Sequence, residues 1–330
     1  MITHRELLRA ASRTFALSIE RLPGLLGESL AVAYLLLRVS DFLEDNAEMP
    51  PERKVALLKL WSQVLSGEER VEALTAQLPA PNGSTSPDQL VAQRAADVLD
   101  VMHRLPLEVQ EEIRSNVRAT TEGMARWQAR GPLVLHEADM DDYMHEVAGR
   151  VGYLVTHLFA WHAAGIRQHQ ERLMPLARDM GLGLQTVNVL RGLRQDYERG
   201  WIYVPLSFCE AVNLAPQDLF KPEYRPQAMQ VVDMIAAKAD RHLLAGKDYI
   251  KAIPARYHSI RLAVMWPLMF AMRTLAVCRH NALVLTGEAK VSRAEIGRIV
   301  RDSSVWGWSN TWIDWYCGRL MVVENGAISF

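Results

Sequence analysis

Apolar residues recur mainly at steps of three and four along this chain, which is the spacing of one face of an α-helix. The first such series is Leu7, Leu8, Ala11, Phe15, Ile19 and Leu22, and Pro23 then ends the helix. The same spacing predicts further helices at about 28–45, after Pro50-Pro51, and at 87–105, 107–129, 139–166, 172–199, 226–252, 258–286 and 291–322. No segment shows sustained alternation of apolar and polar residues, so the pattern predicts an all-α protein without strands.

Two segments lack the helical pattern. Residues 80–88 form a polar loop rich in Pro, Gly and Ser, and Ser86 is a suitable cap for the helix that follows. Residues 200–226 contain four prolines and are predicted to form an irregular loop or lid. Because the rest contains neither a repeat nor a linker, we expect one helical domain over residues 1–330.

The longest apolar run, residues 260–278, is interrupted by Arg261, Pro267 and Arg273. A membrane helix needs about 20 apolar residues with almost no charge. We therefore predict a buried core helix and expect neither a transmembrane segment nor a targeting segment. The three cysteines lie far apart, without metal-ligand spacing or a disulfide pattern, which favours a cytoplasmic location.

Composition narrows the classes of function. Of the 330 residues, 49% are hydrophobic and 23% are charged, and the formal net charge is −1. This composition excludes a disordered or collagen-like chain and allows a sizeable core. A general nucleic-acid binder would need a basic field, so we expect no nucleic-acid partner.

An acidic cluster ends the predicted helix 28–45. Asp41, Glu44 and Asp45 are at positions i, i+3 and i+4 and therefore share a helix face. Three carboxylates this close repel each other unless a cation lies between them, and Mg²⁺ prefers carboxylate and phosphate oxygens. Arg38 and Tyr34 extend the same stripe, and Arg38 is placed to pair with a phosphate or with Asp41.

A second polar stripe lies on the predicted helix 172–199. Gln185, Asn188, Gly192 and Asp196 follow one another at steps of three, four and four, inside a segment rich in Leu and Val. Polar groups on such a helix are costly unless they meet partners, and a diphosphate with its metal ions is one such partner. A helix with one solvated face is the alternative explanation.

The chain resembles the squalene/phytoene synthase family of isoprenoid synthases. The resemblance is carried by four motifs in order, which are Ser12-Arg13-Thr14-Phe15, the segment 34–45, the segment 142–152, and Leu184-Gln185 with Asn188-Val189-Leu190-Arg191. It covers about residues 5–286. It implies an all-α isoprenoid-synthase fold around a central active-site cavity, with acidic residues on two walls that bind Mg²⁺ and diphosphate.

The same resemblance implies a reaction. An allylic prenyl diphosphate is ionised, and an acceptor alkene captures the carbocation. The usual acceptor is a second prenyl diphosphate, joined head to head through a cyclopropyl intermediate, and squalene synthases then reduce the product with NADPH. A hydrophobic product would be compatible with peripheral contact with a membrane. The resemblance assigns catalytic roles to Asp41, Asp45, Arg38 and Tyr143.

The remaining site residues fall into two groups. Those expected to bind substrate or diphosphate are Ser12, Arg13, Phe15, Tyr34, Gln185, Asn188, Arg191, Arg194, Arg199, Trp201 and Tyr203. Those expected to bind metal are Asp41, Glu44 and Asp45 on the first motif, and Asp196 with Asn188 on the second.

The second motif departs from the family pattern, Asn-x-x-Arg-Asp-x-x-Glu-Asp. Gly192 and Gln195 occupy two of its three acidic positions, and only Asp196 is retained. Trp201 stands where the family usually has an arginine, for which Arg194 or Arg199 is a partial substitute. Because Mg²⁺ is held mainly by charged oxygens, these changes weaken the second metal site.

Three hypotheses follow. The first is a Mg²⁺-dependent prenyltransferase that transfers the prenyl cation to a non-diphosphate, aromatic acceptor, since that reaction needs no second diphosphate site. Trp201, Tyr203 and Tyr143 would flank such an acceptor. The second is head-to-head condensation of two prenyl diphosphates, the one case in which NADPH is expected. The third is a terpene cyclase or a diphosphate-binding protein that is not an enzyme, and Gly192 disfavours the cyclase because it lacks a ligand atom.

Overall fold

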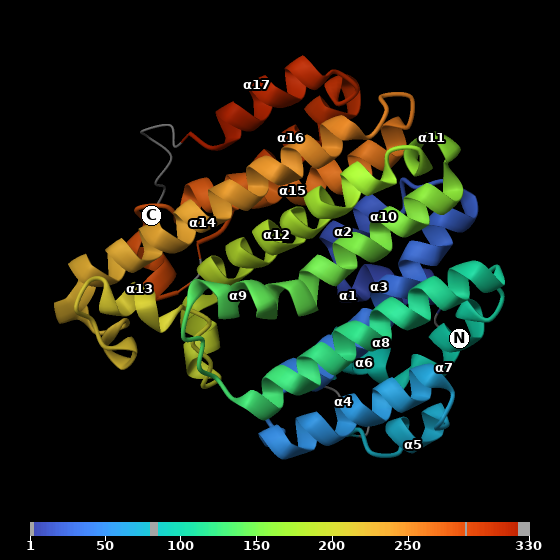
Figure 1. The fold of residues 1–330 in the computed structure, drawn as a ribbon, viewed down its shortest axis with the longest axis horizontal. Helices are drawn as coiled ribbons and strands as arrows, with labels where there is room; N and C mark the ends of the chain where they lie inside the picture. The colour runs from blue at the N-terminus through green and yellow to red at the C-terminus, as the bar shows by residue number, and fades with distance from the viewer. Residues whose placement is uncertain (1–2, 80–84, 288, 323–330) are drawn as a thin grey trace. The chain divides into compact units, whose positions relative to one another are not determined.

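The structure, a computed structural model, describes residues 3–79, 85–287 and 289–322, and it is helical throughout (Figure 1). Within these residues there is no β-strand, and the nearest approach to one is an isolated parallel bridge between Leu133 and Ile202. The prediction of an all-α fold is therefore confirmed.

The chain divides into two compact units. The first comprises Met1–Gly131 with Tyr153–Gln170, and the second comprises Pro132–Gly152 with Glu171–Phe330. The expectation of one domain over residues 1–330 stays a prediction.

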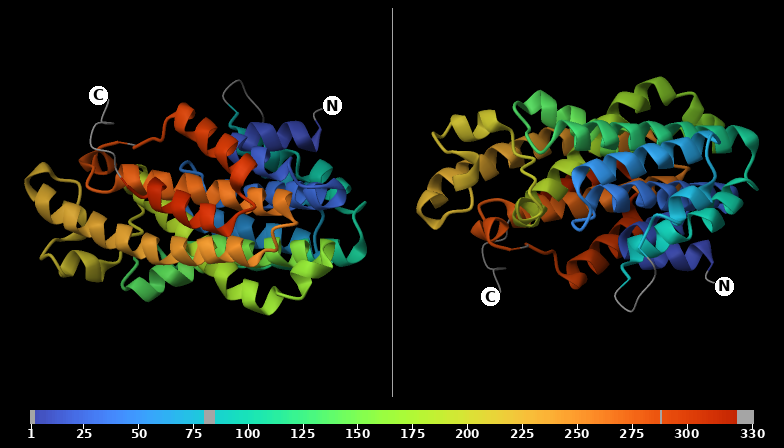
Figure 2. Two further views of the ribbon diagram at one scale, coloured as in Figure 1. Left: turned by 90° about the horizontal axis from the view of Figure 1, so that it is seen from above. Right: turned by 90° about the horizontal axis from the view of Figure 1, so that it is seen from below.

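The first unit is built around one apolar helix. Its elements are α1 (His4–Ala11), α2 (Arg13–Ile19), α3 (Gly24–Asp45), α4 (Pro51–Ser66), α5 (Val71–Thr75), α6 (Pro87–Gln93), α7 (Ala95–Met102), α8 (Leu107–Arg130), most of α10 (Arg150–His162) and α11 (Ala164–Arg167). Helix α3 contacts α1, α4, α6, α7 and α8, and it is apolar on nearly every face. Helices α4 and α8 lie side by side and bury Trp61 and Trp127 completely (Figures 1 and 2).

Capping residues divide two of the predicted helices. The predicted helix over residues 7–22 breaks at Ser12, whose hydroxyl accepts from the Phe15 N–H and caps α2. The predicted helix 87–105 begins, as expected, after the cap Ser86, but it breaks at Arg94 into α6 and α7.

The second unit contains longer helices. Its elements are α9 (Glu137–Met144), the π-helix η1 (His145–Gly149), the start of α10, α12 (Gln170–Glu198), α13 (Leu206–Glu210), the 3₁₀ turns η2 (Pro216–Asp218) and η3 (Pro222–Tyr224), α14 (Arg225–Ala252), α15 (His258–Cys278), the 3₁₀ turn η4 (Ala282–Leu285), α16 (Arg293–Trp306) and α17 (Asn310–Leu320). The predicted loop 200–226 is thus irregular but contains α13 and two 3₁₀ turns. The predicted helix 291–322 breaks between Trp306 and Asn310.

Helix α15 is the predicted core helix. In the part of the chain that the structure describes, α15 alone is long and apolar enough to cross a membrane, and 78% of its most apolar window is buried. It runs alongside α14 in each view (Figures 1 and 2). Arg261, 1% exposed, lies near its start. Its guanidinium donates to the carbonyl oxygens of Ile250 (3.1 Å) and Trp308 (2.6 Å) and to the Asn310 side chain.

Glycines let α12 pass very close to its neighbours. A Cβ on Gly152 would lie 2.3 Å from the Ala177 oxygen, and one on Gly181 would lie 2.4 Å from the Ala148 oxygen. On another side of α12, a Cβ on Gly183 would lie 3.1 Å from the backbone nitrogen of Leu243 on α14. Gly152, in the family-like segment 142–152, and Gly181 and Gly183 on α12 therefore serve helix crossings, which fix where the polar stripe of α12 lies.

Candidate active site

The first acidic cluster lies in the last turns of α3. Glu44 is buried, the Asp41 side chain is 30% exposed, and Asp45 is exposed. Burial and the negative charges of Asp45 and Asp88 raise the pKa of Asp41 to about 6, against the opposing charge of Arg38. Burial and the charges of Asp45 and Asp41 raise the pKa of Glu44 well above its usual value. The helix therefore holds together carboxylates that disfavour each other's ionisation.

This cluster fits a divalent cation by its chemistry. Among the described residues, Glu44 Oε1 is buried without a hydrogen-bond partner, while Gln128 bonds the Glu44 side chain and Lys54 Nζ donates to the Glu44 carbonyl oxygen at 2.7 Å. A cation among the three carboxylates would remove their repulsion and satisfy the buried oxygen. In residues 3–79, 85–287 and 289–322, no three His, Cys, Asp or Glu side chains converge closely enough to form a metal site already in place.

Arg38 lies one turn before Asp41 and is shared between two carboxylates. Its Nη1 donates to Asp41 Oδ2 at 2.7 Å. Its Nε donates to Asp88 Oδ1 at 3.0 Å, and its Nη2 donates to Asp88 Oδ2. The pairing of Arg38 with Asp41 was predicted, whereas Asp88 was not. Asp88 follows the cap of α6, and the helix dipole also favours an acidic residue at this position.

Ser12 and Phe15, two of the residues predicted to bind substrate, lie next to Tyr34 on α3. The rings of Phe15 and Tyr34 are 5.5 Å apart, and the Ser12 side chain hydrogen-bonds Tyr34. Burial raises the pKa of Tyr34. The Arg13 side chain, also predicted to bind substrate, lies outside the described part of the chain. The structure thus brings together Ser12, Phe15 and Tyr34 on the first unit.

The polar stripe of α12 belongs to the second unit. Asn188 Nδ2 donates to Gln185 Oε1 at 3.3 Å. Asp196 is 8% exposed and pairs with Arg199. A Cβ on Gly192 would lie 3.6 Å from Asp196 Oδ2, an ordinary contact distance. The space beside Asp196 is therefore open to a small side chain, as the family pattern with an aspartate at this position requires.

The predicted arginines of α12 lie in different places. Arg199 is beside Asp196. Arg194 pairs with Glu198 at 2.7 Å, and its guanidinium lies 5.8 Å from the centre of the Tyr197 ring. Arg191 is exposed. Of the two proposed substitutes for the arginine replaced by Trp201, the structure therefore favours Arg199 as the cation next to Asp196.

Three predicted aromatic residues form a stack. Tyr143 and Tyr203 are stacked with ring centres 4.5 Å apart, and Tyr203 and Trp201 are stacked at 5.3 Å. Tyr143 occupies the last turn of α9, directly before the π-helix η1, a kind of helix distortion that is frequent at functional sites. The chain turns at Gly200 (φ 82°), and the Trp201 backbone N–H then donates to the backbone carbonyl oxygen of Asp196 at 2.9 Å. This turn fixes the stack relative to Asp196.

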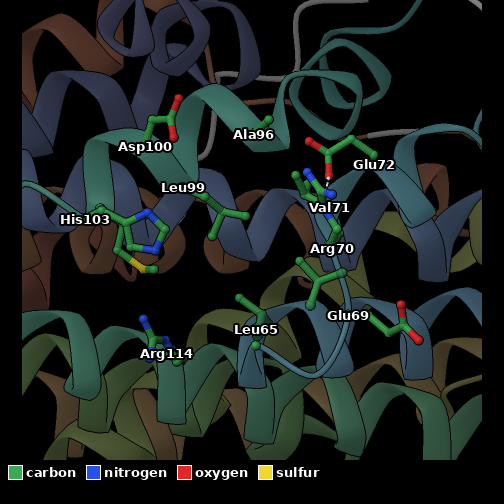
Figure 3. A pocket seen from close by; sticks show the side chains of 13 residues that line it. Leu65, Glu69, Arg70, Val71, Glu72, Ala96, Leu99, Asp100, His103 and Arg114 are labelled. Carbon is green, nitrogen blue, oxygen red and sulfur yellow. Dashed lines mark ion pairs between the residues drawn. The ribbon is translucent and has the colours of Figure 1, made fainter.

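A separate pocket lies within the first unit, between α4, α5, α7 and α8, with a volume of about 410 Å³ (Figure 3). His103 and Arg114 lie at one end, and Arg70 and Glu72, an ion pair at 3.5 Å, lie at the other (Figure 3). None of the predicted site residues lines this pocket.

Comparison with known proteins identifies the family. The profile described as squalene/phytoene synthase matches residues 8–295, most of the chain. The chain is 26% identical over 309 residues to a squalene synthase of Candida albicans, covering 90% of this chain and 66% of that protein. It is 27% identical to human squalene synthase (90% and 68%) and 28% identical to the Botryococcus squalene synthase of Botryococcus braunii (89% and 61%). The chain thus spans about two thirds of the length of these relatives.

Solved structures share the fold. A complex of TcSQS with the ligand BPH1237 matches with a TM-score of 0.83 at 24% identity, covering 99% of this chain and 92% of that one. A dehydrosqualene synthase in complex with a ligand matches with a TM-score of 0.65 at 17% identity, covering 92% and 94%. At these identities the likeness establishes the fold alone, and the fold is the one that the resemblance implied.

Proposed function

This chain belongs to the squalene/phytoene synthase family, whose members are prenyltransferases, and we propose that it joins two prenyl diphosphates head to head to give a squalene-type product. The observation that carries the proposal is the family match over residues 8–295, which includes the acidic cluster of α3 intact. The relatives named above, all squalene synthases, favour this second hypothesis over the aromatic acceptor, which gains no support from them.

The residues of α3 would bind the first diphosphate through divalent metal. Asp41, Glu44 and Asp45 would hold the ion, and Mg²⁺, when bound, supplies positive charge that stabilises the leaving diphosphate. Arg38 has its Nη1 beside Asp41 and would donate to a diphosphate oxygen. The allylic carbon–oxygen bond then breaks with its electron pair on the diphosphate, the double bond of the second prenyl diphosphate attacks the resulting cation, and a proton is lost as the cyclopropyl intermediate forms. Loss of the second diphosphate from that intermediate, with hydride from NADPH, would give a squalene-type product.

On the second unit, the aromatic stack would offer ring faces that attract a cation. Tyr203 is stacked against both Tyr143 and Trp201, so these faces would be those of Tyr143 and Trp201, and Tyr143, only 4% exposed, is shielded from water. The Tyr143 hydroxyl is the group we assign to carry the proton lost when the new carbon–carbon bond forms. Asp196, with the amide oxygens of Gln185 and Asn188, would serve the second diphosphate in place of the missing acids.

Product analysis tests the proposal. The purified protein is incubated with Mg²⁺ and dimethylallyl, geranyl, farnesyl or geranylgeranyl diphosphate, with and without NADPH, and both hydrocarbons and free pyrophosphate are measured. We expect a head-to-head hydrocarbon from farnesyl diphosphate, reduced to a squalene-type product only when NADPH supplies hydride, and no hydrocarbon from Asp41→Ala. Pyrophosphate release with only prenyl alcohols as products would contradict the head-to-head reaction.

A second candidate is transfer of the prenyl group to an aromatic acceptor. The observation that favours it is the pair of neutral residues, Gly192 and Gln195, at the acidic positions of the second motif. Prenyl alcohols alone in the assay above would direct the search to planar aromatic acceptors, and a cyclised product from one diphosphate would indicate a cyclase. A cytoplasmic location and peripheral contact with a membrane remain predictions from the sequence.

A further inference from the structure

Asp88 is a residue near the acidic cluster of α3 to which the proposed reaction assigns no role. It lies in the first turn of α6, directly after the cap Ser86, and its side chain is 31% exposed. Both of its carboxylate oxygens accept hydrogen bonds from Arg38, on Nε and Nη2. Fifty positions separate the two residues in the sequence.

The geometry of this pair fixes the orientation of the guanidinium. Nε and Nη2 are on one edge of the planar guanidinium group, and a carboxylate that accepts from both holds the plane in a single orientation. Nη1 is then left on the far side, where it donates to Asp41 Oδ2 at 2.7 Å. Without Asp88, the same two-point edge of Arg38 would be free to turn onto Asp41 and form the two-point pair there.

Whether Asp88 or Asp41 holds Arg38 matters for the acidic cluster, because Asp41 would also have to bind the divalent cation. A divalent ion that takes Asp41 repels the guanidinium, since both are positive. A side chain held only by Asp41 would move away, whereas one held from the opposite edge by Asp88 stays in place with Nη1 released. An Nη1 that loses Asp41 as its acceptor is a ready donor for a diphosphate oxygen.

We propose that Asp88 is a positioning residue that anchors Arg38 from α6, so that Nη1 passes from Asp41 to the diphosphate when the cation binds. The inference rests on the proposed function, because it takes diphosphate as the ligand. Asp88 itself would not touch the substrate. The alternative is that Asp88 merely joins α6 to α3 and contributes to stability alone.

The direction in which Asp88→Asn changes the affinity for pyrophosphate separates these two explanations. Removing a negative charge near an anion site strengthens anion binding by Coulomb's law. Asp88→Asn should therefore bind inorganic pyrophosphate more tightly if the charge alone mattered. A positioning role predicts the opposite, a weaker binding, because the donor loses its orientation.

Isothermal titration of inorganic pyrophosphate, at a Mg²⁺ concentration that saturates each variant, provides the measurement. We expect Asp88→Asn to weaken binding about tenfold, the size of one charged hydrogen bond, and Asp88→Glu to restore most of it. Asp97→Asn is the matched control, because it breaks a half-buried ion pair with Arg94 (3.0 Å) in the adjoining helix, and it should leave pyrophosphate binding unchanged. In an Arg38→Lys background, Asp88→Asn should have little further effect.

Far-ultraviolet circular dichroism and urea unfolding verify that each variant is folded. Unchanged or tighter binding by a folded Asp88→Asn would overturn the inference, as would an equal loss in the Arg38→Lys background. Failure of the wild-type protein to bind pyrophosphate at all would instead refute the proposed function. If the wild type binds pyrophosphate but forms no hydrocarbon, the head-to-head reaction is contradicted, and the titration still decides the role of Asp88.

Discussion

Replacing Gly181 by alanine should destabilise the protein through a single methyl group. The new Cβ would lie 2.4 Å from the Ala148 oxygen, 2.8 Å from its carbonyl carbon and 3.0 Å from the Gly149 Cα, whereas ordinary contacts begin at 3.4 Å. All three neighbours are backbone atoms, so no side chain can rotate away. Helix α12 would have to move by about 1 Å from η1, which disturbs the packing on both sides of the crossing.

The magnitude follows from two opposing effects. Overpacking in a close-packed region costs about 1–3 kcal/mol, and rigid backbone neighbours place this site at the upper end. Alanine favours a helix over glycine by about 1 kcal/mol, which offsets part of that cost. We therefore expect the free energy of unfolding to fall by about 2 kcal/mol.

Urea unfolding followed by circular dichroism measures this effect, with Gly297→Ala as the matched control. Gly297 lies inside α16, and a Cβ there would meet nothing within 4 Å. The control should gain up to about 1 kcal/mol from helix preference alone. Equal unfolding midpoints for the two variants would refute the argument that Gly181 is required by the crossing.

Three further predictions concern the acidic cluster of α3 and the acidic position that Gly192 occupies on α12. Asp41→Ala and Asp45→Ala should each abolish turnover and leave the circular dichroism spectrum unchanged, and Mg²⁺-dependent turnover in both variants would refute the assignment of the first motif. Because the folded pKa of Asp41 is raised to about 6, its ionisation destabilises the metal-free fold as pH rises through that value. The thermal midpoint of Asp41→Asn should therefore exceed that of the wild type more at about pH 7 than at about pH 4, and an equal difference at both would contradict the raised pKa. The Cβ of Gly192→Asp would lie at an ordinary contact distance, 3.6 Å, from Asp196 Oδ2. This variant should increase head-to-head product, because its carboxylate replaces one of the missing metal ligands, and an unchanged product profile would show that the missing acid is not limiting.

Much of the fold could be predicted because helical periodicity is local. The apolar spacing predicted most of the helices, but it placed the end of α15 at residue 286, eight residues beyond Cys278, and it missed breaks that depend on caps and turns. Ser12 divides α1 from α2 because its hydroxyl finds the Phe15 N–H, and a serine inside a helical pattern gives only a weak signal of this. The π-helix η1 lies where the chain crosses α12, and apolar periodicity gives no signal for such a long-range contact.

The shared face of Asp41, Glu44 and Asp45 could be predicted because one helix carries all three residues, while their role as a site stays a prediction. Spacing alone places Asp41, Glu44 and Asp45 together, and the same arithmetic could have separated Arg194 from the face that carries Asp196 and Arg199. Asp88 could not be found in this way, because its role depends on α6 reaching α3. Neither could the inward orientation of Glu44, which depends on what packs around α3.

The hydrogen bonds of Arg261 tie the core helix α15 to residues that lie beyond the family profile. The family profile stops at residue 295, yet the guanidinium of Arg261 depends on Trp308 and Asn310, which lie beyond that limit. A chain shortened to the profile would lose these acceptors, and with them most of α16 and all of α17, which pack against α15, leaving Arg261 with the carbonyl of Ile250. Hydrogen bonds to a charged group contribute about 1.5–3 kcal/mol each, and uncovering apolar side chains of α15 adds to the loss, so much of the stability of a typical domain would disappear. The region that the family profile matches is therefore shorter than the region that the fold needs, which includes the whole of α16 and α17.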